Sequence, residues 1–550
     1  MNGYPLIRLV CVLGLLAGTM LLIPGASAQL INKPNRVNFW HQDSPDILGT
    51  NETADALGYS SVSGDFNNDG YPDLAIGAPG ESIGNLTSAG SVHVIYGGAT
   101  GLRAAGNQVW SQDTPGIQSA PEAGDAFGFS LASGDFDGDG YDDLAVGSVF
   151  ESVGSEAMAG AVTIIRGGPG GLTADGNQLF SQETAGIEDS AEAGDRCGSA
   201  LAAADFNHDG YADLAIGCPG EDLTADDMGA VAVIYGSAAG LAVEGNQLWH
   251  QESPGIEGVG EEGDAFGSAL AAGDFNNDGF ADLAIGVPVE SVDTTAQAGA
   301  VNIIYGGMAG LTSDSDQIWT QDSAGIEDTA EEGDNFGASL VAGDFNGDGF
   351  DDLAIGVSGE TVNAATGAGA VSVIYGAGGG LLTTGNQIWS QDSDGIIGAS
   401  EAEDTFGSAL GVGDFDNDGF DDLAIGVLFE TIEGEAPVGG AGAVNVIYGR
   451  PGGLGPDGNQ LFTQDNDGLE GDASDFENYG RSLTGADFDL DGFDDLAIGV
   501  DQDMIGEVSA AGAVNVLHGS RPDTLLSDLG RQLRAMIAIQ NILALLNGLL

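Results

Sequence analysis

Short apolar segments alternate with Gly-, Asp- and Asn-rich stretches along most of the chain. One stretch shows the pattern clearly, with apolar segments at residues 127–131, 143–147, 160–165 and 177–182. Each segment is short, rich in β-branched or aromatic residues and bounded by turn-forming residues, which is typical of β-strands and not of helices. The pattern therefore predicts four β-strands in this stretch.

The same four segments recur, and every copy contains the element D-x-[DN]-x-D-G-[YF]-x-D. The element begins at Asp65, Asp135, Asp205, Asp274, Asp344, Asp414 and Asp487, with spacings of 70, 70, 69, 70, 70 and 73 residues. Self-similarity at such a period indicates a repeat architecture, and four antiparallel strands per repeat are typical of a propeller blade. We predict an all-β fold, a seven-bladed β-propeller of four-stranded antiparallel blades.

The fourth segment predicts how the ring closes. It reads N-Q-x-[WF]-x-Q, or D-Q-I-W-T-Q at residues 316–321, and it follows each of the first six copies. A variant at residues 37–43 precedes the first copy, and no such segment follows the seventh. We therefore predict that the N-terminal strand completes the last blade, because this removes an open sheet edge.

The acidic element has the spacing of a calcium loop. Side-chain oxygens at positions 1, 3, 5 and 9, with a backbone carbonyl at position 7, form the oxygen-only shell that Ca²⁺ prefers. The loop is not an EF-hand, because position 12 of the first copy is Ile76 and a strand pattern follows. The alternative is an Asx-rich turn that binds nothing. Seven loops with complete side-chain ligand sets favour up to seven Ca²⁺ sites.

The candidate metal ligands are Asp65, Asn67, Asp69, Tyr71 and Asp73; Asp135, Asp137, Asp139, Tyr141 and Asp143; Asp205, Asn207, Asp209, Tyr211 and Asp213; Asp274, Asn276, Asp278, Phe280 and Asp282; Asp344, Asn346, Asp348, Phe350 and Asp352; Asp414, Asp416, Asp418, Phe420 and Asp422; and Asp487, Asp489, Asp491, Phe493 and Asp495. The Tyr and Phe residues are named for their carbonyl oxygens. No catalytic residue and no other cofactor is predicted.

These motifs resemble a known family. Phe-Gly before the loop, the acidic loop itself and Gly77-Ala78-Pro79 after it are similar to the FG-GAP repeat of integrin α-subunits, over nearly all of residues 36–519. The resemblance implies a seven-bladed propeller whose hairpin loops bind calcium on one face. Other copies depart from the Gly-Ala-Pro motif, as at residues 147–149 and 499–501, and integrins load only some of their blades. No integrin leg domain or transmembrane helix is expected here.

The charge of the chain excludes some partners. The formal net charge is −74, from 85 acidic and 11 basic residues. A polyanion would be repelled, so we expect no nucleic-acid partner. Cations are the natural partners, and such an acidic excess also suits a protein that stays soluble in concentrated salt.

A second acidic pattern recurs in every copy. One acid lies ten residues before each loop and another lies sixteen residues after each loop begins. These acids are Asp55, Asp125, Asp195, Asp264, Asp334, Asp404 and Glu477, and Glu81, Glu151, Glu221, Glu290, Glu360, Glu430 and Asp503. Two interpretations stay open: a ring of paired carboxylates that binds cations or a cationic ligand, opposite the calcium loops, or acids that fix loops by accepting backbone hydrogen bonds.

Two other residue types invite a prediction. Trp110, Trp249, Trp319 and Trp389 recur at one strand position, and we expect them to pack in the core and not to form a sugar-stacking platform. Cys197 and Cys218 lie on predicted hairpin partners, so a disulfide and two buried thiols are both open.

The ends of the chain differ from the repeats. Residues 1–28 read as a signal peptide, with Arg8, an apolar run and an Ala26-Ser27-Ala28 cleavage site, and a membrane anchor is the alternative. The propeller is expected over residues 29–520. Residues 521–550 carry Leu and Ile at helical spacing, which predicts a C-terminal amphipathic helix that docks or self-associates. No transmembrane span is expected in the mature chain.

We expect a secreted or extracellular protein, with cell-surface association as an option, that acts as an adhesion or ligand-binding module for an extracellular protein or glycan. The alternatives are a structural surface scaffold of a salt-adapted organism and a hydrolase acting on extracellular polysaccharide or phospholipid. The chain contains no nucleophile elbow, H-E-x-x-H motif or P-loop, which favours a protein that is not an enzyme.

Overall fold

A computed structural model describes residues 29–31, 38–432, 437–466, 469, 471 and 473–520. Leu30–Gly519 forms one compact unit. The expected signal peptide at 1–28 and the expected C-terminal helix at 521–550 lie outside the described residues.

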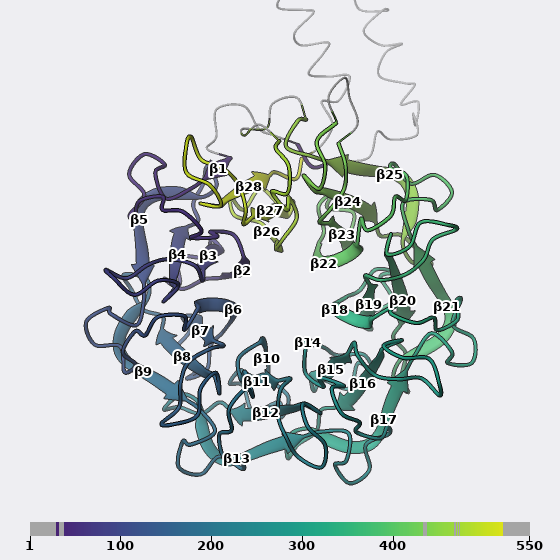
Figure 1. Cartoon of the computed structure of the whole chain (residues 1–550), viewed down its shortest axis with the longest axis horizontal. Coiled ribbons are helices and arrows are strands. Elements are labelled where there is room, and N and C mark those ends of the chain that lie inside the picture. Colours follow the sequence, from purple (N-terminus) through teal and green to yellow (C-terminus); the bar gives the residue numbers. More distant parts are fainter. Residues whose placement is uncertain are drawn as a thin grey trace, which may run out of the picture. The chain divides into compact units, whose positions relative to one another are not determined.

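The compact unit consists of seven four-stranded antiparallel sheets arranged around an axis (Figure 1). Blade 1 contains β2 (Ser60–Gly64), β3 (Asp73–Ala78), β4 (Ser91–Tyr96) and β5 (Arg103–Trp110). Blade 2 contains β6 (Phe127–Gly134), β7 (Asp143–Ser148), β8 (Ala161–Arg166) and β9 (Thr173–Phe180). Blade 3 contains β10 (Ala200–Ala204), β11 (Asp213–Cys218), β12 (Ala230–Tyr235) and β13 (Ala242–Trp249). Blade 4 contains β14 (Ala269–Gly273), β15 (Asp282–Val287), β16 (Ala300–Tyr305) and β17 (Thr312–Trp319).

Blade 5 contains β18 (Phe336–Gly343), β19 (Asp352–Val357), β20 (Ala370–Tyr375) and β21 (Leu382–Trp389). Blade 6 contains β22 (Phe406–Gly413), β23 (Asp422–Val427), β24 (Ala443–Tyr448) and β25 (Gly455–Phe462). Blade 7 contains β26 (Leu483–Ala486), β27 (Asp495–Val500), β28 (Ala513–Leu517) and β1 (Phe39–Trp40). This confirms the predicted seven-bladed propeller.

The second strand of each blade is buried along its whole length. It pairs with a strand on either side within its own sheet, and both faces of that sheet are covered by the neighbouring blades. A strand covered on both faces reads as a continuous apolar run and does not alternate. This explains why every copy contains the sequence Asp-Leu-Ala-Ile-Gly, or Asp-Leu-Ala-Val-Gly in blade 2.

The N-terminal strand closes the ring, as predicted. In blade 7, β1 pairs with β28 through Phe39↔Asn515 and Trp40↔Val514. The amide of Val516 also donates to the carbonyl of Asn38 at 2.8 Å. The first and last strands of the propeller therefore belong to one sheet, and blade 7 has no missing strand.

Apolar side chains fill the space between adjacent blades. One cluster joins Phe66 and Val94 of blade 1 to Phe127 and Leu144 of blade 2, and all four side chains are fully buried. Each fully buried side chain of this size contributes about 1.5–3 kcal/mol. The recurring tryptophans take part in these clusters, with Trp110 and Trp389 buried and Trp249 and Trp319 partly buried, which confirms their packing role.

A disulfide joins Cys197 to Cys218 in blade 3, across 21 residues of sequence. At the position of Cys197, blades 2, 4, 5 and 6 hold Phe, blade 1 holds Leu57 and blade 7 holds Tyr479. At the position of Cys218, the other blades hold small or β-branched residues. Of the two alternatives, the structure contains the disulfide and not a pair of thiols.

Removal of this disulfide is expected to destabilise blade 3. Replacing Cys197 and Cys218 with Ser should lower the free energy of unfolding by about 3 kcal/mol, which is the chain-entropy effect for a loop of this length. Cys197→Phe with Cys218→Val introduces the residues found in blades 4, 5 and 6 and should recover part of the loss, because the Phe fills the core position again. Chemical unfolding of both double variants measures the effect, and equal stability of the Ser variant and the wild type would contradict it.

Candidate metal centres

The candidate ligands lie in the seven loops that join the first and second strands of the blades. In the first loop, Asp65 accepts hydrogen bonds from the amides of Asp69 at 3.0 Å and Gly70 at 2.8 Å. Gly70 has φ +88°, a conformation that favours glycine. Asp69 in turn accepts from the amide of Tyr71 at 3.1 Å. The two bonds to the position-1 carboxylate recur in all seven loops, so this carboxylate organises each turn.

The carboxylate at position 9 is the first residue of a buried strand. Asp73 is fully buried, and it accepts hydrogen bonds from the amides of Gly97 at 2.8 Å and Phe66 at 3.1 Å. Burial raises the pKa of Asp73 to about 7; the Gly97 amide opposes this rise, and the charges of Asp65 and Asp69 add to it. Burial likewise raises the pKa of the equivalent residues Asp143, Asp213, Asp282, Asp352 and Asp422. A buried carboxylate near other carboxylates is stabilised in its charged form by a cation.

Position 3 supplies further oxygens. The Oδ1 atoms of Asn207, Asn276 and Asp416 are buried and have no hydrogen-bond partner among the described residues. In the sixth loop, oxygens of Asp414, Asp416 and Asp422 lie within 4.8 Å of one another. That separation fits a shell with metal–oxygen bonds of about 2.4 Å, as in calcium sites. In chemistry and spacing, these loops therefore fit a hard cation.

Two loops arrange position 3 differently. The amide nitrogen of Asn67 donates to Asp73 at 3.2 Å, and that of Asn346 donates to Asp352 at 3.2 Å. In these loops the amide nitrogen, and not its oxygen, faces the position-9 carboxylate.

Buried basic side chains lie in two of the seven loops. In blade 2, Arg166 contacts the Asp137 carboxylate and lies 3.4 Å from Asp143 Oδ2. In blade 7, His518 Nδ1 lies 2.9 Å from Asp495 Oδ2. The equivalent residues of the other blades are Tyr96, Tyr235, Tyr305, Tyr375 and Tyr448. Sequence reasoning missed this difference, although the change from Tyr to a base at one position of the repeat was a visible signal.

Neighbouring loops are tied to one another. Asp142, at position 8 of the second loop, accepts from the amide of Asp65 at 2.8 Å and donates its own amide to the Asp65 carbonyl at 3.2 Å. The same side-chain bond links Asp351 to Asp274 at 2.8 Å. Sequence reasoning missed position 8, because the residue there contacts a different blade. The ties place the loops side by side on one face of the propeller.

Comparison with known proteins identifies the repeats. The FG-GAP repeat family matches residues 57–95, 127–165, 198–234, 266–303, 336–374, 406–447 and 479–517. The chain is an FG-GAP repeat protein. Each match begins at the Phe-Gly position or its equivalent, includes the acidic loop and ends in the third strand of a blade.

Curated relatives share parts of this FG-GAP region. Phosphatidylinositol-glycan-specific phospholipase D of Bos taurus is 38% identical over 162 residues, which is 29% of this chain and 18% of that protein. Integrin alpha-PS2 of Drosophila melanogaster is 32% identical over 252 residues, 44% of this chain and 16% of that protein. The matched stretches thus span only a small part of each relative. A solved structure, "Structure of Dos1 propeller", matches with a TM-score of 0.39 and 13% identity, covering 85% of this chain and 94% of that chain.

The described part of the FG-GAP protein contains no helix with the length and apolar character needed to cross a membrane.

The second acidic pattern lies at the other end of the first hairpin, between FG-GAP blades. Asp125 Oδ2 accepts a hydrogen bond from the amide of Glu122 at 2.5 Å, as expected for an acid that fixes a loop. Glu151 is held differently, because Gln112 reaches across from blade 1 and donates to it at 2.5 Å. Both kinds of bond recur at all seven blade interfaces. Sequence reasoning missed the glutamine, since its partner lies in another sheet.

One feature of the FG-GAP ring breaks its symmetry. At the residue after Phe-Gly, blades 1, 2 and 7 carry Tyr59, Phe129 and Arg481, and the other blades carry Ser or Ala. Ring centroids of Tyr59 and Phe129 lie 5.0 Å apart, Phe150 packs on Phe129 at 6.1 Å, and the Arg481 guanidinium lies 4.1 Å from the Tyr59 centroid. Phe129 and Arg481 line a cavity of about 300 Å³ between the innermost strands. This aromatic patch lies at the end of those strands opposite the hairpin loops.

Proposed function

We propose that this FG-GAP repeat protein is a secreted, calcium-stabilised module that binds an extracellular protein or glycan. The observation that carries the calcium part is the set of buried position-3 oxygens without hydrogen-bond partners, in loops whose position-9 carboxylates are also buried. An unpaired buried oxygen costs about 1–3 kcal/mol, and an ion that it ligates offsets that cost. The ligands are the residues at positions 1, 3, 5, 7 and 9 of the loops, and the cation supplies the positive charge that these clustered carboxylates need.

The aromatic patch supports the ligand-binding part. A purely structural ring has no need of different residues at equivalent positions of the blades. Tyr59, Phe129 and Arg481 combine apolar surface, stacking faces and a positive charge, which are enriched at binding hot spots. The similarity to integrin alpha-PS2 also favours a binding module.

Replacement of the aromatic patch is expected to weaken ligand binding without affecting the fold. Tyr59→Ser with Phe129→Ser should weaken binding at least about tenfold, the effect of losing roughly 1.4 kcal/mol. The test screens the wild type against extracellular-matrix proteins and glycans with calcium and with chelator, and then measures the variant on each binder found. Ser268→Ala, at the equivalent position of blade 4, is the matched control. Equal binding by the double variant would show that the ligand binds elsewhere.

A hydrolase is the second candidate, because the relative of Bos taurus is named as a phospholipase D. A parallel assay on phospholipid and polysaccharide substrates separates the two functions, since a binding module retains its ligand unchanged.

The loop of blade 2 is expected to bind calcium more weakly than the other loops. The Arg166 guanidinium contacts two of its ligands and takes the place of a cation. Arg166→Tyr restores the residue found in most blades and should raise the affinity of this site about tenfold or more, because one nearby positive charge is removed. Calcium titration by calorimetry measures the change.

Arg103→Gln is the control for that titration. Arg103 pairs with Asp69 of the blade 1 loop at 3.1 Å, but both side chains are substantially exposed to solvent. Exposed pairs contribute little, so this variant should change calcium affinity less than Arg166→Tyr does. Equal effects of the two substitutions would contradict the prediction that Arg166 weakens calcium binding in the blade 2 loop.

A further inference from the structure

The interface between blades 2 and 3 concentrates acidic side chains that the hairpin loops do not use. Oxygens of Glu192, Asp195 and Glu221 lie within 4.8 Å of one another. Asp195 and Glu221 are each only 1% exposed. Burial, together with the neighbouring carboxylates of Asp189, Asp195 and Glu192, raises the pKa of Glu221 to about 10. We call Gln182, Glu192, Asp195 and Glu221 the interblade cluster.

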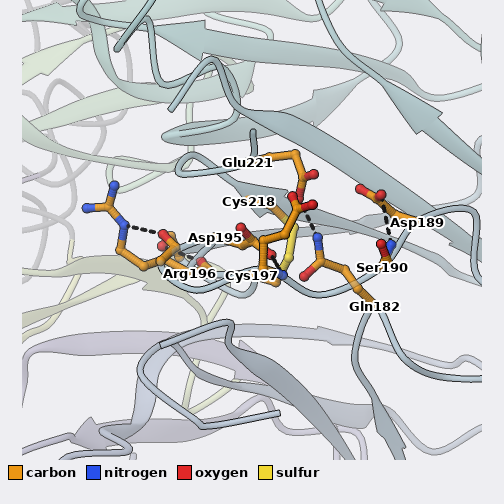
Figure 2. Close-up of a disulfide and its surroundings, with 11 residues drawn as sticks. Gln182, Asp189, Ser190, Asp195, Arg196, Cys197, Cys218 and Glu221 are labelled. Carbon is orange, nitrogen blue, oxygen red and sulfur yellow. Dashed lines mark hydrogen bonds between the residues drawn. A yellow bond between two sulfur atoms is a disulfide. The ribbon is translucent and has the colours of Figure 1, made fainter. Parts of the chain in front are cut away.

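No base compensates this charge within the described residues. Arg196 is adjacent in sequence, but its guanidinium pairs with Asp227 at 3.4 Å and points away from Gln182 and Glu221 (Figure 2). The other basic side chains in ion pairs of the described chain are Arg103, Arg166, Arg450 and His518, and all of them bind other acids. Two buried carboxylates without a counter-charge are costly, so the cluster requires a proton or a cation.

A second and independent observation points to a cation. Gln182 is only 7% exposed, and its Oε1 has no hydrogen-bond partner among the described residues. Its Nε2 donates to Glu221, and the two side chains point toward each other (Figure 2). Asp195 Oδ1 and Glu221 Oε1 are likewise buried and without a hydrogen-bond partner. The cluster thus holds unpaired oxygens of three different side chains.

The glutamine recurs at every blade interface, and in each case its side-chain oxygen lacks a hydrogen-bond partner among the described residues. Its Oε1 is buried and unpaired at Gln42, Gln112, Gln182, Gln251, Gln321, Gln391 and Gln464. An orphaned acceptor costs about 1–3 kcal/mol, and its repetition in every blade calls for a common cause. An amide exposes either its oxygen or its nitrogen to a neighbour, depending on the direction in which it is turned. If the side-chain amide is rotated by 180°, its oxygen takes the place of its nitrogen beside the carboxylates. Oxygens of all these side chains then face one another, as they do around a bound cation.

We propose that the interblade cluster is a second type of calcium site, in which Gln182, Glu192, Asp195 and Glu221 hold one Ca²⁺ between blades 2 and 3. Four oxygen-bearing side chains, three of them carboxylates, match the preference of Ca²⁺ for hard oxygen ligands. This site is separate from the hairpin loops. Its ligands come from two blades, whereas the ligands of each hairpin loop come from one blade.

The interface between blades 4 and 5 contains the same constellation. Glu331, Asp334 and Glu360 have oxygens within 4.8 Å of one another, and Gln321 donates to Glu360 at 2.7 Å. Blade 7 differs, because Ser474 replaces the glutamate three residues before the buried acid. We expect calcium between blades 4 and 5 as well, and weaker binding at the interface of blades 6 and 7.

The first test uses the wild-type protein, so that it does not depend on a variant that folds. Crystals of the full chain grown with Ca²⁺ should give anomalous peaks within about 2.6 Å of Asp195 and Glu221 oxygens. Peaks in the hairpin loops with none at the interblade cluster would overturn this proposal and leave the hairpin sites standing. Peaks at the interblade cluster alone would support it and reject the hairpin sites.

The second test counts bound ions with ⁴⁵Ca²⁺ by equilibrium dialysis. Asp195→Asn with Glu221→Gln keeps acceptor oxygens but removes two charges, and it should lose one bound calcium per chain. The matched control is Glu244→Gln, an exposed acid on β13 of the same blade, which should lose none. Asp205→Asn with Asp209→Asn removes the hairpin ligands of blade 3, and all four substitutions together should lose two ions. An unchanged count in the Asp195/Glu221 variant would overturn the proposal.

Discussion

Chelation of calcium at low ionic strength is expected to lower the stability of the propeller by on the order of 10 kcal/mol. Each site held at one hundred times its Kd contributes about 2.7 kcal/mol, and several sites act on one cooperative ring. The apo protein also keeps its loop carboxylates close together without counter-charge. Thermal unfolding with calcium and with EDTA measures the loss.

Two controls separate the effect of calcium from general charge repulsion and from the effect of another divalent cation. Repeating it in about 1 M NaCl should reduce the difference, because the Debye length falls to about 3 Å and exposed carboxylates no longer repel at a distance. Magnesium should restore less stability than calcium, since Mg²⁺ requires shorter bonds in a strict octahedron. The same unfolding midpoint with and without EDTA at low salt would reject calcium as the stabilising ion.

Loss of the closing strand is expected to be the most damaging local change. Trp40 is 2% exposed and packs against Leu57 and Val514 in the cluster that joins blades 7 and 1. Trp40→Ala should therefore lower the free energy of unfolding by about 3–5 kcal/mol. It should also release β1 from β28, since only two residues of β1 pair with it. Hydrogen exchange at the β28 amides measures this opening.

The matched control is Trp110→Ala in blade 1. Trp110 occupies the same strand position and is 7% exposed, but its strand is continuous with the rest of the blade. This variant should lose comparable stability without faster exchange in β28. If both variants opened β28 equally, the ring would not depend on β1 for closure.

The periodic sequence was sufficient to predict the blades and the closing strand. A short apolar run such as residues 143–147 recurs in every copy, which predicts the same strand in every blade. The fourth segment is missing after the seventh copy, and the segment at residues 37–43 is the one in the chain that can replace it. The hairpin-loop residues were found for the same reason, because their spacing is local.

Contacts between blades were not predictable in the same way. Gln112 and Glu151 are 39 residues apart and belong to different sheets, so no local period connects them. The sequence indicated the acid but not the glutamine that holds it. Arg166 was visible as an exception, but only the folded blade shows that its guanidinium reaches Asp137 and Asp143.

The pairing of β1 with β28 also determines when the ring can form. The last blade combines a strand made first during synthesis with strands made last, while each other blade is contiguous in sequence. Blades 1 to 6 can therefore form one after another as the chain grows, and blade 7 has to wait until residue 517 has been added. Until then the ring stays open and its two ends remain exposed, so the ring closes only after all seven repeats have been synthesised.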